Sequence, residues 1–462
     1  MIYLNAVNVF YWIEKPKTNT IDLRSFVSFT VITATKFTLI TYICSPLNPV
    51  FVSQINKLKI LNDPIYGFIT IPNPLLFDLI QHPYFQRLRR ITQMGLSYLV
   101  YPGAHHTRFH HALGCMHMMQ KAIEVLKFKG IAISSDEENA LLIAILLHDI
   151  GHGPFSHAME HSIVEDVNHE AISLLFMNQL NQEFDGKLTL AIQIFKGEYH
   201  RKFMLQLISS QLDMDRMDYL KRDSFYTGVA EGNINSDRLI QMLNVVDDVL
   251  VMEEKGIYSI EKFLMARRLM YWQAYLHKTS LVAELILTKI LKRAKELTLK
   301  GNVLPSSKAL LYFLSHKITT ENFDSVVLNK FSQLDDYDVI SAIKEWQDSE
   351  DFILSSLSKM IINRDLLKVK LSREKFDKEM LNNLIERFSK QNNCSLQDAK
   401  YFIFKGKIEN QAYSKDAEPI HILKKDKTIE DVVEASDQLN SKALSKPVTK
   451  YYICYPKQLL ES

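Results

Sequence analysis

The sequence contains few of the residues that build disulfide scaffolds, thiolate zinc sites or nucleic-acid-binding tails. Only 4 of its 462 residues are cysteines, and no two of them form a Cys-x-x-Cys pair. This spacing argues against a disulfide framework and a thiolate zinc site, and it favours a reducing, cytoplasmic location. The formal net charge of +2 argues against a dedicated nucleic-acid binder and an acidic tail. The 14 glycines are few for this length, so we expect few loops and many helices.

The overall composition is that of an ordinary globular protein. Hydrophobic residues make up 47% of the chain and charged residues 23%. The length suffices for about two to four domains. Four regions are predicted: a leader over 1–56, a core over 57–300, a helical extension over 301–394, and a small α+β subdomain over 395–462.

The first 56 residues differ from the rest. "SFVSFTVITATKFTLITYICSPL", residues 25–47, is rich in β-branched and aromatic residues and has one interior charge, Lys36. The favoured interpretation is a disordered or spurious leader. A membrane anchor is an alternative, since about 20 apolar residues span a bilayer, but Lys36 and the threonines weaken it. Ordinary structure within the fold is the third alternative, and no firm membrane association is predicted.

From Lys57 onward the pattern predicts a mainly α fold with short β-hairpins. "KLKILNDPIYGFITIP" predicts a strand pair, because proline and glycine punctuate it. Two helices are expected on either side of His82-Pro83, since the residue before proline leaves the α region. A short strand is expected at "GIYSI", 256–260. Amphipathic spacing predicts further helices over 108–130, 136–150, 169–184, 203–224, 236–250 and 260–299.

The C-terminal tail has a different pattern. "KYFIFKGKIENQAY" and "KYYICYPK" alternate like strands, and "TIEDVVEASDQL" between them predicts a helix. We therefore expect a small α+β appendage, although no linker rich in proline, serine or glycine marks where it begins.

Histidines are concentrated in one part of the chain. Ten of the fifteen lie between His105 and His169, and "LLHDIGHGPFSH", residues 146–157, holds three of them beside an aspartate. A single buried His–Asp pair could be structural. Clustering on this scale indicates a site.

Imidazole and carboxylate groups suit a divalent cation that keeps open positions for water and substrate. Adjacent helical residues point about 100° apart, so His148 and Asp149 can share one metal only at a helix end. Gly151, Gly153 and Pro154 predict that end. The candidate ligands are His111 in "RFHHALG", His148, Asp149, and Asp215 in "QLDMDRMDYLKRD".

These motifs resemble those of the HD-domain metal-dependent phosphohydrolases. Within that superfamily the sequence looks most like the deoxynucleoside triphosphate triphosphohydrolases, which include the vertebrate enzymes with SAM and HD domains. The resemblance runs from about Lys59 to Lys278, outside the leader and the tail, and it implies a helical HD-domain core. It rests on "NDPIYGFI", "PYFQRLRRITQMG", "YPGAHHTRFHHALG", "HDIGHGPFSH", "NHE", "LDMDRMDYLKRD" and "YLHK".

The resemblance also implies which residues bind metal and which act in catalysis. The implied metal ligands are His111, His148, Asp149 and Asp215. The implied catalytic residues are His169, His152, His157 and Glu170. One divalent ion per site is expected, and Mn, Mg, Fe and Zn are not distinguished. Such an ion activates water, and a nearby histidine can move protons at neutral pH. His105, His106 and His117 match no family role and are interpreted as surface or packing residues.

Substrate contacts follow from the same resemblance. The implied phosphate ligands are Arg108, Arg216 and Arg267, whose forked guanidinium groups suit phosphate. The implied sugar and base contacts are Gln93, Tyr219, Asp223 and Tyr275. In the family the first tyrosine packs on the sugar and excludes a 2′-hydroxyl, whereas the glutamine and aspartate bind the 3′-hydroxyl. Tyr219 and Asp223 follow Asp215 by one and two helical turns, so one face should carry all three.

Nucleotide activation is where the resemblance weakens. Lys59, Gln86 and Arg89 match positions that bind an activating nucleotide in vertebrate members. Gln81, however, replaces the acidic residue that reads guanine there, which argues against guanine-specific activation.

The expected function is metal-dependent hydrolysis of deoxynucleoside triphosphates, dGTP included, to a deoxynucleoside and inorganic triphosphate. The alternatives are an HD phosphohydrolase acting on another phosphorylated metabolite and a metal-binding regulatory module without turnover. The expected partners are a nucleotide and further copies of the chain in a homo-oligomer. Nucleic acid could contact the basic segment 289–302, but a mixed charged helix face is the favoured interpretation.

Overall fold

The computed structural model describes residues 59–460 except 156–157, 160–161, 165–166, 412, 415–417 and 438–445. The chain divides into two units, Met1–Lys57 and Leu58–Ser462. Predictions for the leader, including the alternative of an anchor over 25–47, lie outside the described residues. Within the described part, none of the helices combines the length and apolar character that a membrane span requires.

The described chain begins with the predicted β-hairpin. β1 (Lys59–Asp63) pairs antiparallel with β2 (Gly67–Ile71). Two helices follow, α1 (Pro74–Gln81) and α2 (Pro83–Gln86), and the extended backbone of His82 separates them ahead of the proline. These predictions from proline and glycine punctuation are confirmed.

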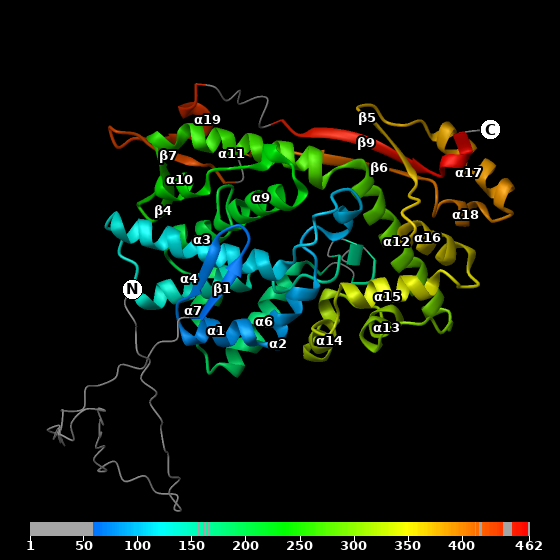
Figure 1. The fold of residues 1–462 in the computed structure, drawn as a ribbon, viewed down its shortest axis with the longest axis horizontal. Coiled ribbons are helices and arrows are strands. Elements are labelled where there is room, and N and C mark those ends of the chain that lie inside the picture. The colour runs from blue at the N-terminus through cyan, green and yellow to red at the C-terminus, as the bar shows by residue number, and fades with distance from the viewer. Residues whose placement is uncertain are drawn as a thin grey trace, which may run out of the picture. The chain divides into compact units, whose positions relative to one another are not determined.

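Three helices form the centre of the unit. α3 (Arg108–Phe128) packs against α4 (Ser135–Leu147) and α9 (Met214–Thr227). Most side chains of α3 are buried, which explains its weak amphipathic pattern. α6 (His169–Glu183) lies further along the chain (Figure 1). The predicted mainly α fold with short hairpins is confirmed.

The predicted helix over 203–224 is wrong, because the segment forms two helices. α8 (Lys202–Ile208) ends before a short connection, and α9 then starts at Met214. Asp213 caps α9 by accepting a hydrogen bond of 2.7 Å from the backbone N–H of Arg216. This cap sets the position of the first turn of α9.

The predicted helix over 236–250 is correct only in its first part. α10 (Ser236–Gln241) is followed by a hairpin of β3 (Leu243–Val246) and β4 (Val249–Glu253). Asp247 and Asp248 between the strands both have positive φ, the conformation of a tight two-residue hairpin turn. The valines on either side favour strands over helix.

The region 256–299 also differs from prediction. The expected strand at 256–260 is wrong, since Ile257–Ile260 form the first turn of α11 (Ile257–Met270). The expected single helix over 260–299 is interrupted by a π-helical turn at Tyr271–Tyr275. α12 (Lys278–Leu299) then begins where the His277 ring accepts a hydrogen bond from the backbone N–H of Thr279.

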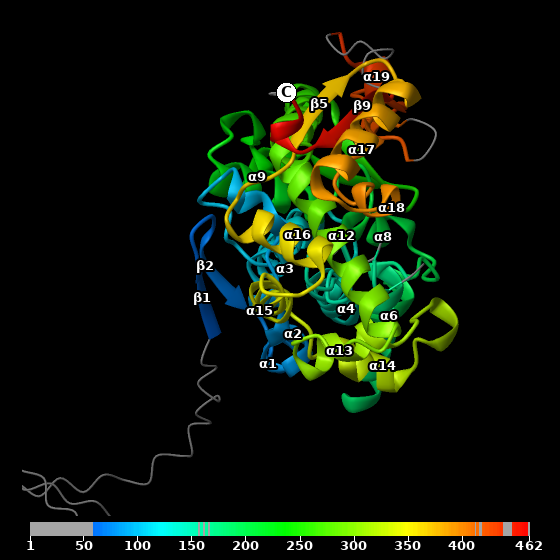
Figure 2. The same cartoon turned by 90° about the vertical axis from the view of Figure 1, so that its right-hand side faces the viewer.

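The tail contributes strands to two small sheets. β5 (Lys368–Ser372), β9 (Val448–Tyr455) and β6 (Phe404–Asn410) form an antiparallel sheet in that order. β7 (His421–Leu423) pairs parallel with β4. The two strands predicted in the tail are confirmed. Figures 1 and 2 show these orange and red elements on the side of the unit opposite α1 and α2.

The helix expected at "TIEDVVEASDQL" is mostly wrong. Its first part is β8 (Ile429–Asp431), and only Val432–Ala435 form a short helix, α19. The predicted domain boundaries stay predictions. The remaining α-helices among the described residues are α7 (Thr189–Phe195), α13 (Lys308–Ser315), α14 (Ser325–Phe331), α15 (Asp336–Trp346), α16 (Phe352–Ile362), α17 (Lys378–Asn392) and α18 (Leu396–Ala399).

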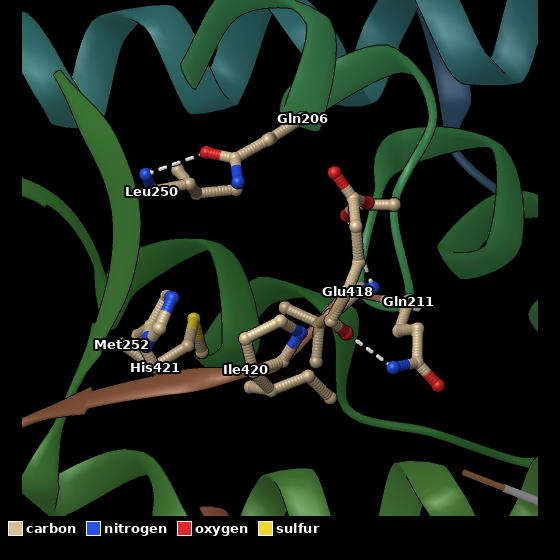
Figure 3. Close-up of a pocket in the computed structure, with 10 residues that line it drawn as sticks. Gln206, Gln211, Leu250, Met252, Glu418, Ile420 and His421 are labelled. Carbon is tan, nitrogen blue, oxygen red and sulfur yellow. Dashed lines mark hydrogen bonds between the residues drawn. The ribbon is translucent and has the colours of Figure 1, made fainter. Parts of the chain in front are cut away.

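The tail also contacts the connection between α8 and α9. A small pocket of about 20 Å³ lies where β4, β7 and this connection meet (Figure 3). Gln211 Nε2 donates a hydrogen bond to the carbonyl of Ser414 at 2.6 Å and another to that of Glu418, and its Oε1 accepts one from the backbone N–H of Ser414 at 3.0 Å. The tail therefore supports the segment that leads into α9.

Candidate functional site

Side chains from three elements meet at one buried point. They come from α3 (His111), from the turn after α4 (His148 and Asp149) and from the first turn of α9 (Asp215). His111 Nε2 lies 3.1 Å from Asp215 Oδ1 and 3.7 Å from Asp149 Oδ2. His148 Nε2 lies 3.6 Å from Asp215 Oδ1 and 3.5 Å from Asp149 Oδ1. The structure thus brings together all four residues predicted to bind metal.

The nitrogen and oxygen atoms in this cluster suit a divalent cation. The Nδ1 atom of His148 lies 2.6 Å from the carbonyl oxygen of Ile145, so it donates there and leaves Nε2 as the free acceptor. That Nε2 atom is buried and makes no hydrogen bond within the described part of the chain. Two imidazole nitrogens and two carboxylates facing one point could hold a metal ion with open positions for water.

The turn after α4 is fixed by contact with α6. A side chain at Gly151 would place its Cβ atom 2.2 Å from the carbonyl oxygen of His169 and 2.3 Å from the backbone nitrogen of Ser173, so only glycine fits. The Ser173 hydroxyl donates to the carbonyl of His148 at 2.8 Å and accepts from the N–H of Gly151 at 2.9 Å. Sequence reasoning missed this supporting serine.

A second group of side chains adjoins the first. The rings of His152 and His169 stack at a centroid distance of 3.9 Å, and His152 Nε2 lies 3.3 Å from Asp149 Oδ1. Burial, reinforced by the charge of Arg108, lowers the pKa of His152 to about 3. His152 is therefore neutral near pH 7. His169 lies at the start of α6 and is partly exposed to solvent.

The other two predicted catalytic residues are placed less closely. Glu170 is exposed in the first turn of α6, directly after His169. His157 lies outside the described residues, so its role stays a prediction.

A cavity of about 320 Å³ lies beside the His–Asp cluster. Arg108 joins the two, because it lines the cavity and its Nη1 atom lies 2.6 Å from Asp149 Oδ2. Phe155, Tyr271 and Glu284 also line the cavity. The predicted substrate residues in its lining are Gln93, Arg108, Tyr219, Asp223 and Tyr275.

Asp223 is held from two sides at the wall of this cavity. The Tyr275 hydroxyl donates to Asp223 Oδ2 at 2.8 Å, and His106 Nε2 lies 2.6 Å from Asp223 Oδ1. The His106 ring is buried and stacks on Tyr226 at 4.4 Å. His106 was interpreted as a surface or packing residue, and the surface interpretation is wrong.

Two predicted phosphate ligands lie outside the lining of the cavity. Arg216 Nε donates to the carbonyl of Ser210 and lies 3.3 Å from Asp213 Oδ2. Arg267 is half-buried, and its Nε and Nη1 atoms are buried without a hydrogen bond in the described structure. Burial raises the pKa of Tyr219, and the positive charge of Arg267 acts on that pKa in the opposite direction. The two side chains are therefore near each other.

A helical core that gathers histidines and aspartates from two helices and from the turn after a third, beside a cavity, is typical of an HD-domain hydrolase. The HD domain model matches residues 108–223, and the HD associated region matches residues 234–310. The chain therefore belongs to the HD-domain metal-dependent phosphohydrolase superfamily, as the sequence resemblance predicted.

Relatives extend over most of the chain. The uncharacterized protein YwfO of Bacillus subtilis is 33% identical over 423 residues, which cover 88% of this chain and 94% of YwfO. The deoxynucleoside triphosphate triphosphohydrolase SAMHD1 of Homo sapiens is 28% identical over 287 residues, 53% of this chain and 46% of SAMHD1. The crystal structure of a phosphohydrolase from Bacteroides thetaiotaomicron is 53% identical with a TM-score of 0.84, over 86% of this chain and 100% of that one.

Proposed function

We propose that the protein hydrolyses deoxynucleoside triphosphates, dGTP among them, to a deoxynucleoside and inorganic triphosphate. The observation that carries this proposal is the cavity in which Gln93, Arg108, Tyr219, Asp223 and Tyr275 meet beside the His–Asp cluster. The similarity to SAMHD1 over about half of each chain supports the same substrate class.

In this proposal the metal ligands are His111, His148, Asp149 and Asp215. A divalent cation held by them would supply Lewis-acid stabilisation of a phosphoryl oxygen and lower the pKa of water. Arg108, beside Asp149, would bind phosphate oxygens where the cavity meets the cluster. Arg267, whose buried Nε and Nη1 atoms make no hydrogen bond to the described residues, is a second candidate for binding the phosphate chain.

The reaction would break the bond between the α-phosphorus and the 5′-oxygen of the sugar. A water molecule supplies the new oxygen on phosphorus and loses a proton, and the departing 5′-oxygen gains one. His169 is the candidate for moving a proton at this point, because it lies at the edge of the cluster and is partly exposed. The stacked, neutral His152 would hold its ring in place.

The cavity also offers groups for the sugar and the base. Asp223, oriented by His106 and Tyr275, would accept a hydrogen bond from the 3′-hydroxyl. The ring of Tyr219 would pack on the sugar. Glu284 offers a carboxylate in the same cavity, and guanine is the base with two adjacent N–H donors that a carboxylate can accept together.

The test is hydrolysis of each of the four dNTPs by the purified protein with Mn²⁺ or Mg²⁺, with product analysis by chromatography. We expect deoxynucleoside and triphosphate in a one-to-one ratio, and no turnover by Asp215→Asn. Stepwise release of phosphate would favour an HD phosphohydrolase for another phosphorylated metabolite. Metal binding without turnover of any nucleotide would favour a regulatory module. The predicted homo-oligomer can be measured on the same sample by light scattering.

A further inference from the structure

A chain of buried charged groups lies behind His111, on the side away from the cluster. His111 Nδ1 lies 2.7 Å from Asp218 Oδ2. Arg222 donates to both oxygens of Asp218, from Nε at 2.9 Å and from Nη2 at 3.0 Å. Arg222 Nη1 also donates to Asp63 Oδ2 at 2.8 Å, and the Tyr66 hydroxyl donates to Asp218 Oδ1 at 2.8 Å.

This network is almost completely excluded from solvent. The side chains of Arg222 and Asp218 are 0% exposed and that of Asp63 is 4% exposed. Buried charges are tolerated only when their hydrogen-bonding groups find partners, and here Asp218 accepts from three different side chains. A fully satisfied network of this kind has one geometry.

A glycine in α3 makes room for the network. A Cβ atom at Gly114 would lie 2.0 Å from Asp218 Oδ1 and 2.3 Å from Arg222 Nη2. Gly114 follows His111 by three residues, so it faces the same side of the helix. The glycine of "HHALG" therefore lets Asp218 and Arg222 reach the back of the histidine.

The hydrogen bond to Asp218 determines which nitrogen of His111 is available. If Nδ1 donates to the carboxylate, Nε2 must carry the lone pair, and Nε2 is the atom that faces Asp149 and Asp215. A carboxylate behind a metal-binding histidine fixes the tautomer and ring orientation and raises the basicity of the ligand.

The network extends to the β1–β2 hairpin. Asp63 closes β1, and its Oδ1 atom accepts hydrogen bonds from the backbone N–H groups of Ile65 and Tyr66 in the turn. The same residue binds Arg222 through Oδ2, and Tyr66 binds Asp218 directly. The shape of this turn and the position of the carboxylate behind His111 are therefore linked.

We propose that Asp218 is a positioning residue of the metal site and that the β1–β2 hairpin, through Asp63 and Tyr66, holds it in place. This inference rests on the proposed function in one respect, namely that His111 is a metal ligand. It assigns to the hairpin, more than 100 residues before α9 in the sequence, control over metal affinity.

The experiment measures Mn²⁺ affinity by electron paramagnetic resonance on the full chain after treatment with a chelator. Asp218→Asn removes the charge at constant shape, and we expect affinity to fall about 10- to 100-fold. Tyr66→Phe removes one hydrogen bond from the hairpin to Asp218 and should lower affinity by at least about threefold, the effect of losing a single hydrogen bond. Tyr84→Phe makes the same chemical change outside the network and should bind Mn²⁺ like the wild type.

The melting temperature of each chelator-treated variant separates positioning from general stability. A loss of Mn²⁺ affinity in Tyr66→Phe at an unchanged melting temperature would support the proposal, even if Asp218→Asn fails to fold. Wild-type affinity in Tyr66→Phe, or in a folded Asp218→Asn, would overturn it. Absence of Mn²⁺ binding by the wild type would instead contradict the metal site of the proposed function.

Discussion

Discrimination against ribonucleotides should depend on the ring of Tyr219. This ring lines the cavity and meets Tyr275 edge-on at a centroid distance of 6.1 Å, next to Asp223. A 2′-hydroxyl placed against it would lose water without gaining a hydrogen-bond partner. Such burial costs about 1–3 kcal/mol, which is about a ten- to hundredfold loss of affinity. We therefore expect kcat/KM for dGTP to exceed that for GTP by about this factor.

The assay compares kcat/KM for dGTP and GTP in three proteins. Tyr219→Ala removes the ring and should narrow the gap between the two sugars to a few-fold, mainly by improving GTP relative to dGTP. Tyr219→Phe is the matched control, because it keeps the ring and loses only the hydroxyl, and it should keep the wild-type ratio. Equal rates on dGTP and GTP in the wild type would refute the reasoning, as would an unchanged ratio in Tyr219→Ala.

Three further outcomes are expected. His169→Ala should retain Mn²⁺ binding yet slow turnover by about 10²- to 10⁴-fold, and an unchanged rate would exclude proton transfer by this residue. Glu284→Gln should lower the ratio of kcat/KM for dGTP to that for dATP by about tenfold, because an amide cannot accept hydrogen bonds from both guanine N–H groups. An unchanged ratio would show that Glu284 does not contact the guanine base. A variant beginning at Asn56 should keep its melting temperature and activity, because the second unit starts at Leu58 and β1 is its first strand. A large drop in either quantity would show that residues before Asn56 support the core.

Sequence periodicity predicted the helices whose apolar residues recur regularly, and it failed where local chemistry ends an element. The pair Asp247-Asp248 adopts positive φ and turns the chain into a hairpin, although the spacing of apolar residues over 236–250 also fits a helix. Similarly, the His277 ring caps a new helix within a segment that was expected to be continuous. The ends of these elements depend on single residues. A periodicity averaged over a whole segment does not reveal the effect of one residue.

The candidate site was predictable to the extent that its residues lie in dense motifs. The histidine cluster and the family resemblance together indicated His111 and His148, and the structure brings them to within reach of Asp215. His106 and Asp218 were missed because their contacts form only in the folded chain. His106 reaches Asp223 across 117 residues, and Asp218 reaches His111 across 107. No spacing rule within one helix predicts pairings at that separation.

The helix α9 links these contacts through its own period. Asp215, Tyr219 and Asp223 are four residues apart, so one face of α9 carries the cluster and the wall of the cavity. Asp218 and Arg222 are also four residues apart. They follow Asp215 and Tyr219 by three residues, so their row is rotated by only about 60° around the helix from the first, and it carries the network to the hairpin. Any displacement of α9 along its axis would move both faces together. If the proposed function holds, metal binding, sugar recognition and the β1–β2 hairpin would therefore be coupled through this one helix.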